Sequence, residues 1–345
     1  MKTPETLFDQ KRRSFLKLSG LLGLGAASAA LLPAEKAEAF LFGKKEYKVT
    51  KTRLAMGTFV AMTAIHSSRD EAEHAIGLAF EEIDRLNSVL THFEKSSAVG
   101  TFNAAGKLAD PPAEVLDLVA RSLYYNRVTN GAFDITVMPL VDLYKNSFAD
   151  NRKPTDIEIE KVLKCVGSEN LHFQSGSLVL GKSDMAITLD GIAKGFIVDK
   201  ASEVLAANGV HNHLINAGGD IRTSGTADKG RAWTVAIQDP GKSREYPDII
   251  TMKDGAIATS GNYEIYYDKE KLFHHIINSH TGHSPHLSSS VTVIAPTVMD
   301  ADAMATSVFV MEPAAGVQFV NGQADCECFV IGSKGDVSRS RGWQV

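Results

Sequence analysis

The stretch Thr188-Leu189-Asp190-Gly191-Ile192-Ala193-Lys194-Gly195 joins a short apolar segment to a helical pattern. Residues 186–189 are predicted to form a strand, and residues 195–207 a helix that Asn208-Gly209 ends. Free N–H groups at the start of a helix attract anions, Lys194 adds a positive charge, and glycine lets a backbone approach a phosphate closely. The stretch therefore indicates either a phosphate site or a plain turn between strand and helix.

The rest of the chain has patterns of both helices and strands, without regular alternation between them. Helices are predicted at residues 71–90, 113–128 and roughly 301–311, and a short one from the capping box Thr155-x-x-Glu158 to Leu163. A strand pair is predicted over 47–65, broken at Met56-Gly57-Thr58, and single strands at 177–180, 212–216, 232–237, 291–295 and 328–331. The glycine-rich pieces lack the spacing of a dinucleotide fingerprint or a P-loop. We therefore expect an α/β fold of the mixed α+β kind and not a Rossmann sheet.

The composition is that of an ordinary globular protein. The chain has 345 residues, of which 44% are hydrophobic and 22% charged, which excludes collagen, coiled coil and disorder as its main state. Its formal net charge of -5 gives no basic excess, so nucleic acid is not an expected partner. An acidic protein that handles phosphate needs a metal ion or local lysines. Cys165, Cys326 and Cys328 cannot form a disulfide framework, and whether two of them pair stays open.

Residues 1–39 are predicted to be a cleaved export signal, outside the fold. The basic stretch Lys11-Arg12-Arg13-Ser14-Phe15-Leu16-Lys17 precedes a mildly apolar run over 18–32, and Ala37-Glu38-Ala39 offers a cleavage site. A transmembrane anchor is the alternative, but a membrane span needs about 20 apolar residues and this run is shorter. The paired arginines resemble the twin-arginine export motif of bacteria. We therefore expect a mature domain of residues 40–345 in the periplasm.

Two side chains of the predicted C-terminal helix suggest a metal site. Asp302 and Thr306 lie four residues apart, so they share one helix face. Their oxygens suit Mg²⁺, which keeps substrate phosphate oxygens among its ligands. A helix-terminal acid beside an exposed threonine would give the same pattern. Likewise, Asp220 could cap a turn after two glycines, and His275 could be a buried core histidine.

The order of the polar, glycine-containing segments is more informative than any one of them. From Met56 to about Met311 the chain contains Met-Gly-Thr, Gly-Ala-Phe-Asp, Gly-Ile-Ala-Lys-Gly, Gly-Gly-Asp, Thr-Ser-Gly, His-Ile-Ile and Ala-Asp-Ala-x-x-Thr. In this order of motifs it resembles the ApbE-type FAD:protein FMN transferases. The resemblance implies a T-fold-like architecture, bound FAD and Mg²⁺. It also implies that FMN passes from FAD to a Thr or Ser hydroxyl of a partner, an exported domain of a membrane redox complex, and that AMP leaves.

The resemblance also assigns roles to single residues of this chain. The residues that would contact FAD are Met56, Phe93, Ala132, Phe133, Asp134, Thr188 and Lys194, and those that would hold Mg²⁺ are Gly191, Asp302 and Thr306. Phe93 stands where the family usually has Tyr, which keeps a ring for stacking and loses a hydroxyl. A carboxylate has moved by two positions, from that of Thr188 to Asp190, which alters the expected ribose or adenine contact. Asn278-Ser279-His280 replaces Asp-Pro-Arg, and these changes indicate a divergent branch.

The implied reaction transfers a phosphoryl group from a pyrophosphate to an alcohol, which depends on neutralised charge and on alignment. A base must take the proton of the acceptor hydroxyl. His275 is the first candidate for this base and Asp302 the second. Two alternatives remain: an FAD pyrophosphatase in which water replaces the acceptor, and a non-catalytic periplasmic flavin-binding assembly factor. The sequence does not identify the acceptor or the oligomeric state.

Overall fold

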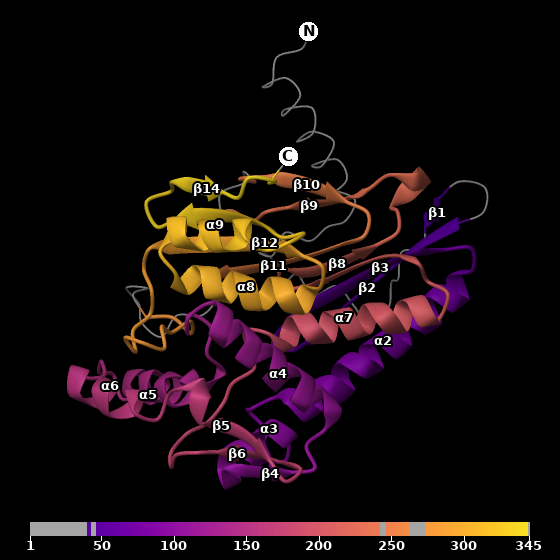
Figure 1. Ribbon diagram of the computed structural model, residues 1–345. Helices are drawn as coiled ribbons and strands as arrows, with labels where there is room; N and C mark the ends of the chain where they lie inside the picture. Colours follow the sequence, from indigo (N-terminus) through magenta and orange to yellow (C-terminus); the bar gives the residue numbers. More distant parts are fainter. Residues whose placement is uncertain (1–39, 43–45, 242–245, 263–272, 344–345) are drawn as a thin grey trace. The chain divides into compact units, whose positions relative to one another are not determined.

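A nine-stranded antiparallel sheet organises the part of the chain that the structure describes (Figure 1). The computed structural model describes residues 40–42, 46–241, 246–262 and 273–343, and all of them belong to one compact unit. In spatial order, the strands are β1 (Phe40–Phe42), β2 (Glu46–Ala55), β3 (Thr58–His66), β7 (Asn212–Ala217), β8 (Asp220–Ser224), β11 (Gly255–Gly261), β12 (Ser288–Ala295), β13 (Glu327–Gly332) and β14 (Val337–Arg339). The predicted export signal over 1–39 lies outside the described residues.

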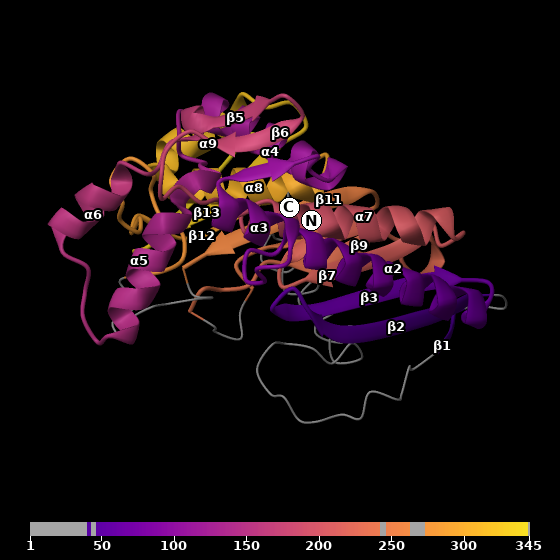
Figure 2. The same cartoon turned by 90° about the horizontal axis from the view of Figure 1, so that it is seen from below.

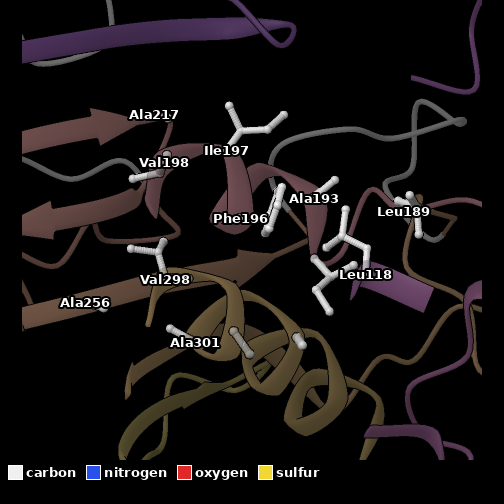
Figure 3. Packing of buried hydrophobic residues seen from close by; sticks show 14 of the residues in the cluster. Leu118, Leu189, Ala193, Phe196, Ile197, Val198, Ala217, Ala256, Val298 and Ala301 are labelled. Atoms are coloured by element: carbon white, nitrogen blue, oxygen red, sulfur yellow. The ribbon is translucent and has the colours of Figure 1, made fainter. Parts of the chain in front are cut away.

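Three helices cover one face of this sheet and lie side by side on it (Figures 1 and 2). They are α2 (Arg69–Leu90), α7 (Ala193–Ala207) and α8 (Val298–Val310). Alternate residues of β3 point to the helices, so Val60, Met62 and Ala64 are buried while Phe59 is exposed. Side chains of α7 and α8 meet in the main buried cluster, as Figure 3 shows. Among the described helices, none is both long and apolar enough to cross a membrane.

Smaller elements complete the fold on both sides of the large sheet. Strands β9 (Trp233–Ala236) and β10 (Ile249–Met252) pair with each other and contribute to a second buried cluster. A separate three-stranded sheet contains β4 (Lys107–Ala109), β5 (Leu171–Gln174) and β6 (Ser177–Leu180). The remaining helices are α3 (Ala98–Ala105), α4 (Ala113–Val128), α5 (Met138–Ala149), α6 (Asp156–Leu163) and α9 (Pro313–Asn321), with short turns of 3-10 helix at Ile135–Val137, Ser168–Asn170 and Asp228–Gly230.

The predictions from local patterns are mostly confirmed. The expected strand pair is β2 and β3, and the expected helices at 71–90, 113–128 and 301–311 are α2, α4 and α8. Thr155 and Glu158 form the expected capping box at the start of α6. Helix α7 begins at Ala193, two residues before its predicted start. Helix α9 was not predicted; Pro313 is its first residue, and the Glu312 side chain caps its N–H groups.

The predicted strand at residues 186–189 is wrong. Its apolar alternation is real, because Ile187 and Leu189 are buried. However, the Asn103 side-chain amide accepts from the N–H of Ile187 and donates to its carbonyl, and the Thr188 N–H donates to the carbonyl of Ile135. A side chain and a single carbonyl therefore satisfy the backbone that a neighbouring strand would otherwise bind.

The three cysteine thiols are free. Cys326 and Cys328 are buried, which agrees with a role as small apolar residues. Strand β13 begins at Glu327, one residue before its predicted start, so Cys328 lies in the strand and Cys326 precedes it. Burial raises the pKa of each of these two thiols to about 11, so neither is a ready nucleophile at neutral pH.

Candidate functional site

A two-residue turn places Met56 at the tip of the β2–β3 hairpin. Met56 and Gly57 both have positive φ angles, of 50° and 71°, as a type I′ turn requires. The tip packs against the turn between β7 and β8, since a Cβ added at Gly218 would lie 2.5 Å from Oγ1 of Thr58. The Met-Gly-Thr and Gly-Gly-Asp motifs, far apart in the chain, therefore lie together.

The start of α7 has a positively charged side chain in contact with this turn. Lys194 is the second residue of α7, and its Nζ lies 3.6 Å from Oδ2 of Asp220. Asp220 begins β8 and is 1% exposed, whereas the Lys194 side chain is 23% exposed. Asp220 thus forms an ion pair with Lys194, a role beyond that of a turn cap. The contact holds the Lys194 charge at the start of α7, where the positive end of the helix dipole would also favour a phosphate.

The three predicted metal ligands lie around the same helix start. Asp302 is buried in α8, and its Oδ2 accepts a 3.1 Å hydrogen bond from the N–H of Gly195. Thr306 follows one turn later, and its Oγ1 would lie 3.0 Å from a Cβ added at Gly191. Ser260 of β11 belongs to the Thr-Ser-Gly motif, to which the sequence assigned no role, and its Oγ lies 3.3 Å from the Thr306 hydroxyl. The structure therefore brings Gly191, Asp302 and Thr306 together.

The donor set fits Mg²⁺. It offers the carboxylate of Asp302 and the hydroxyl of Thr306, and the resemblance assigns a main-chain oxygen of Gly191 as a third ligand; all are hard oxygen ligands. Within the described ranges, no group of three or more His, Cys, Asp or Glu side chains is arranged to hold a metal ion. A magnesium ion at Asp302 and Thr306 would therefore take further ligands from water and substrate phosphate, as this ion commonly does.

The Gly-Ala-Phe-Asp motif also reaches this region. The Phe133 ring is buried and would lie 3.3 Å from a Cβ at Gly191, so glycine there leaves room for the ring. Ala132 is half-buried beside it. The Asp134 carboxylate accepts hydrogen bonds from the backbone N–H and the hydroxyl of both Thr136 and Ser168, and one from the Asn126 amide. Asp134 therefore fixes the loop that presents Phe133.

His275 belongs to a segment that is fastened to the same loop. The Ser279 hydroxyl donates a 2.6 Å hydrogen bond to the carbonyl of Gly131, and Nε2 of His280 lies 2.8 Å from the carbonyl of Asn130. Two of the residues that depart from the family motif thus join these two segments. His275 is half-buried. The segment that contains the predicted base is therefore attached to the loop that presents Phe133.

The loop after α2 adds an aromatic surface. The Phe93 ring is 73% exposed, and its centroid lies 3.9 Å from that of His92. Nε2 of His92 lies 3.1 Å from Oδ2 of Asp190, whose N–H donates to the Thr188 hydroxyl. Desolvation by the surrounding protein opposes ionisation of Asp190, although its side chain stays 58% exposed, and the hydrogen bond and charge of His92 lower its pKa. Sequence reasoning did not include His92, although the displaced carboxylate at Asp190 was a signal.

A buried polar network fixes the position of α8. The Asp300 carboxylate accepts hydrogen bonds from Nε of Arg121 and from the Tyr125 hydroxyl, both on α4. Burial and the Asp300 charge raise the pKa of Tyr125, so its hydroxyl remains a donor. Asp199 of α7 accepts from the N–H groups of Val298 and Met299 at the start of α8. These contacts hold the helix face that presents Asp302.

The comparisons with known proteins agree with this geometry. A model of the ApbE family matches residues 56–330. A protein named FAD:protein FMN transferase from Vibrio cholerae is 34% identical over 244 residues, which cover 67% of this chain and 72% of that protein. One of the same name from Escherichia coli is 31% identical over 268 residues, covering 74% and 76%. The crystal structure of the ApbE protein from Thermotoga maritima, 28% identical, matches with a TM-score of 0.78 over 85% of this chain and 97% of that one. The chain therefore belongs to the ApbE family.

Proposed function

We propose that this protein is an FAD:protein FMN transferase, which moves FMN from FAD to a Thr or Ser hydroxyl of another protein and releases AMP. The main support is the meeting of separate segments at one helix start. Gly191 and Lys194 of the α7 start lie against Thr306 of α8 and Asp220 of β8 respectively. Relatives that carry the transferase name cover most of the chain.

Each part of the site has a role in this reaction. Lys194 and the positive end of the α7 dipole bind the diphosphate of FAD. Asp302, Thr306 and the Gly191 carbonyl hold Mg²⁺, which supplies charge neutralisation at the diphosphate. The residues that contact the flavin part of FAD are Met56, Phe93, Ala132 and Phe133. Thr188 lies at the position of the ribose or adenine contact. Asp134 acts through the loop that it fixes.

His275 is the favoured base for the acceptor hydroxyl. It is half-buried, in a segment that Ser279 and His280 attach to the loop before Phe133. Asp302 is less suited to this role, because its carboxylate accepts from the Gly195 N–H and is assigned to the metal. A neutral imidazole is a better acceptor for a hydroxyl proton near neutral pH than a carboxylate in such an environment.

The test is a transfer assay with defined products. The mature protein is incubated with FAD, Mg²⁺ and an exported redox domain that has an exposed Thr, and mass spectrometry follows the acceptor. We expect one FMN added to a Thr or Ser of the acceptor and one AMP released for each FMN. AMP release without a modified acceptor would instead establish an FAD pyrophosphatase. FAD binding with neither product would establish a flavin carrier or assembly factor.

We also propose that residues 1–39 direct the folded protein to the periplasm by the twin-arginine route, where an exported domain of a membrane redox complex is the acceptor. The paired guanidinium groups of Arg12 and Arg13 are the proposed recognition feature. The double substitution Arg12→Lys, Arg13→Lys is expected to leave the precursor uncleaved in the cytoplasm. Lys17→Arg, which leaves the pair intact, is the control. Cell fractionation that finds wild-type periplasmic amounts of the double variant would contradict the proposal.

A further inference from the structure

We infer that His92 and Asp190 form a positioning pair. Their hydrogen bond holds the exposed Phe93 ring at a fixed position relative to the start of α7, where the diphosphate is proposed to bind. The contact joins two loops, one after α2 and one before α7, whose paired residues are 98 positions apart in the chain. The inference rests on the proposed function. It adds two residues that would fix the flavin-binding loop without contacting the reacting atoms.

His92 is the fixed member of the pair. Its side chain is 6% exposed, whereas that of Asp190 is 58% exposed. The imidazole stands 3.9 Å from the Phe93 ring, centroid to centroid, at an interplanar angle of 36°. An exposed aromatic ring on a loop would lose conformational freedom when it stacks on a ligand, and this cost weakens binding. The buried imidazole beneath Phe93 reduces that freedom before the ligand binds.

Asp190 connects this ring to the phosphate end of the site. Its backbone N–H donates to the Thr188 hydroxyl, which fixes the turn that precedes Gly191. A Cβ added at Gly191 would lie 3.0 Å from Oγ1 of Thr306 and 3.3 Å from the Phe133 ring, so this turn lies beside both side chains. The path from Phe93 through His92 and Asp190 therefore ends at the residues assigned to the metal and the diphosphate. A ligand that spans both ends, as FAD does, binds best when their separation is preset.

Other charged groups surround the pair without replacing it. Asp142 and Lys145 lie on α5, where burial raises the pKa of Asp142 and the charges of His92 and Lys145 oppose this rise. Nζ of Lys145 lies 5.9 Å from the centre of the Phe93 ring. Asp142 offers a matched control, because its carboxylate is close enough to His92 to interact electrostatically. Loss of charge near His92 can thus be separated from loss of the hydrogen bond.

The test is a double-mutant cycle on the mature protein with His92→Ala, Asp190→Ala and the two combined. KM for FAD, kcat for transfer and quenching of flavin fluorescence on binding are measured for each variant. We expect each single variant to raise KM about tenfold, as for loss of a charge-assisted hydrogen bond, with kcat within about twofold of wild type. The combined variant should bind no more weakly than the weaker single one, since both lose the same contact.

Two further variants separate positioning from folding. His92→Gln keeps a side-chain N–H donor near the place of Nε2 and should recover KM to within about threefold of wild type. Asp142→Asn should leave KM and kcat unchanged. Multiplicative effects in the cycle, an unchanged KM in His92→Ala, or a fall in kcat alone would overturn the inference. If the wild type binds FAD without transferring FMN, the proposed function fails, while the fluorescence arm of the cycle still decides the role of the pair.

Discussion

Asp302→Asn is expected to lower FMN transfer by about a thousandfold or more while FAD binding stays nearly unchanged. Asp302 supplies the single carboxylate of the proposed metal site, and it is buried beside the α7 start. The charge that builds up on the departing AMP must be offset, and only interactions that strengthen in the transition state accelerate the reaction. The proposed contacts to the flavin and adenine parts of FAD involve other residues, so affinity should depend little on this charge.

The choice of asparagine follows from the hydrogen bond between Asp302 and Gly195. An amide oxygen can still accept from the Gly195 N–H, so Asp302→Asn removes the charge and keeps the contact, whereas Asp302→Ala removes both. Comparing the two variants separates the role of the charge from that of the packing between α7 and α8. Their unfolding transitions in the absence of ligand should differ, with Asp302→Ala the less stable.

Thr306 provides the control for this prediction. Thr306→Ala should be milder and partly restored by excess Mg²⁺, because water can replace a neutral hydroxyl, whereas no solvent molecule replaces the Asp302 charge. In-gel fluorescence of the flavinylated acceptor across a Mg²⁺ titration measures transfer, and calorimetry measures FAD affinity. Full transfer by Asp302→Asn, or wild-type transfer in excess chelator, would contradict the assignment.

Elements with complete local signals could be predicted from the sequence. The turn at Met56-Gly57 ends one strand and starts the next through backbone conformations that glycine makes possible. The Thr155 capping box contains both of its partners within four residues. Helix α2 has a long apolar face that buries Ile76, Ile83 and Leu86. In each case the residues that determine the element lie within one turn of the chain or along one face of a helix.

Elements decided by distant partners could not be predicted in this way. Residues 186–189 have the alternation of a strand, but Asn103 satisfies part of their backbone, and nothing near them in the sequence indicates this. His92 was missed because its partner, Asp190, is 98 residues away. The Asp300 contacts with α4 are similarly remote.

The residues of the candidate site were easier to predict than the residues that hold them in position, because the resemblance identified whole motifs. It named Gly191, Asp302 and Thr306, which the fold does bring together. It gave Asp134 a contact with FAD, whereas its carboxylate binds Thr136, Ser168 and Asn126 in the structure, which favours a supporting role. Motifs therefore indicate which segments meet. Whether a residue of a motif contacts the ligand or supports a loop depends on its neighbours in the folded structure.

Gly195→Ala is expected to be the most destabilising of the substitutions considered, by about 3 kcal/mol or more. An added Cβ would lie 2.4 Å from the carbonyl oxygen of Val298 and 2.8 Å from Cα of Met299. This backbone cannot move aside easily, because Asp199 binds the N–H groups of both residues. Helix α7 would have to shift away from α8, which would break the bond between the Gly195 N–H and Asp302 and abolish transfer.

Gly77→Ala makes the same chemical change in another helix and should have the opposite effect. Gly77 lies inside α2, and no atom would lie within 4 Å of a Cβ added there. Alanine is favoured over glycine in a helix interior by about 0.5–1 kcal/mol, so this variant should be slightly more stable than wild type. Denaturant unfolding followed by the fluorescence of buried Trp233 and Trp343 measures both variants. Equal shifts of the two unfolding midpoints would show that contact between α7 and α8 does not require glycine at 195.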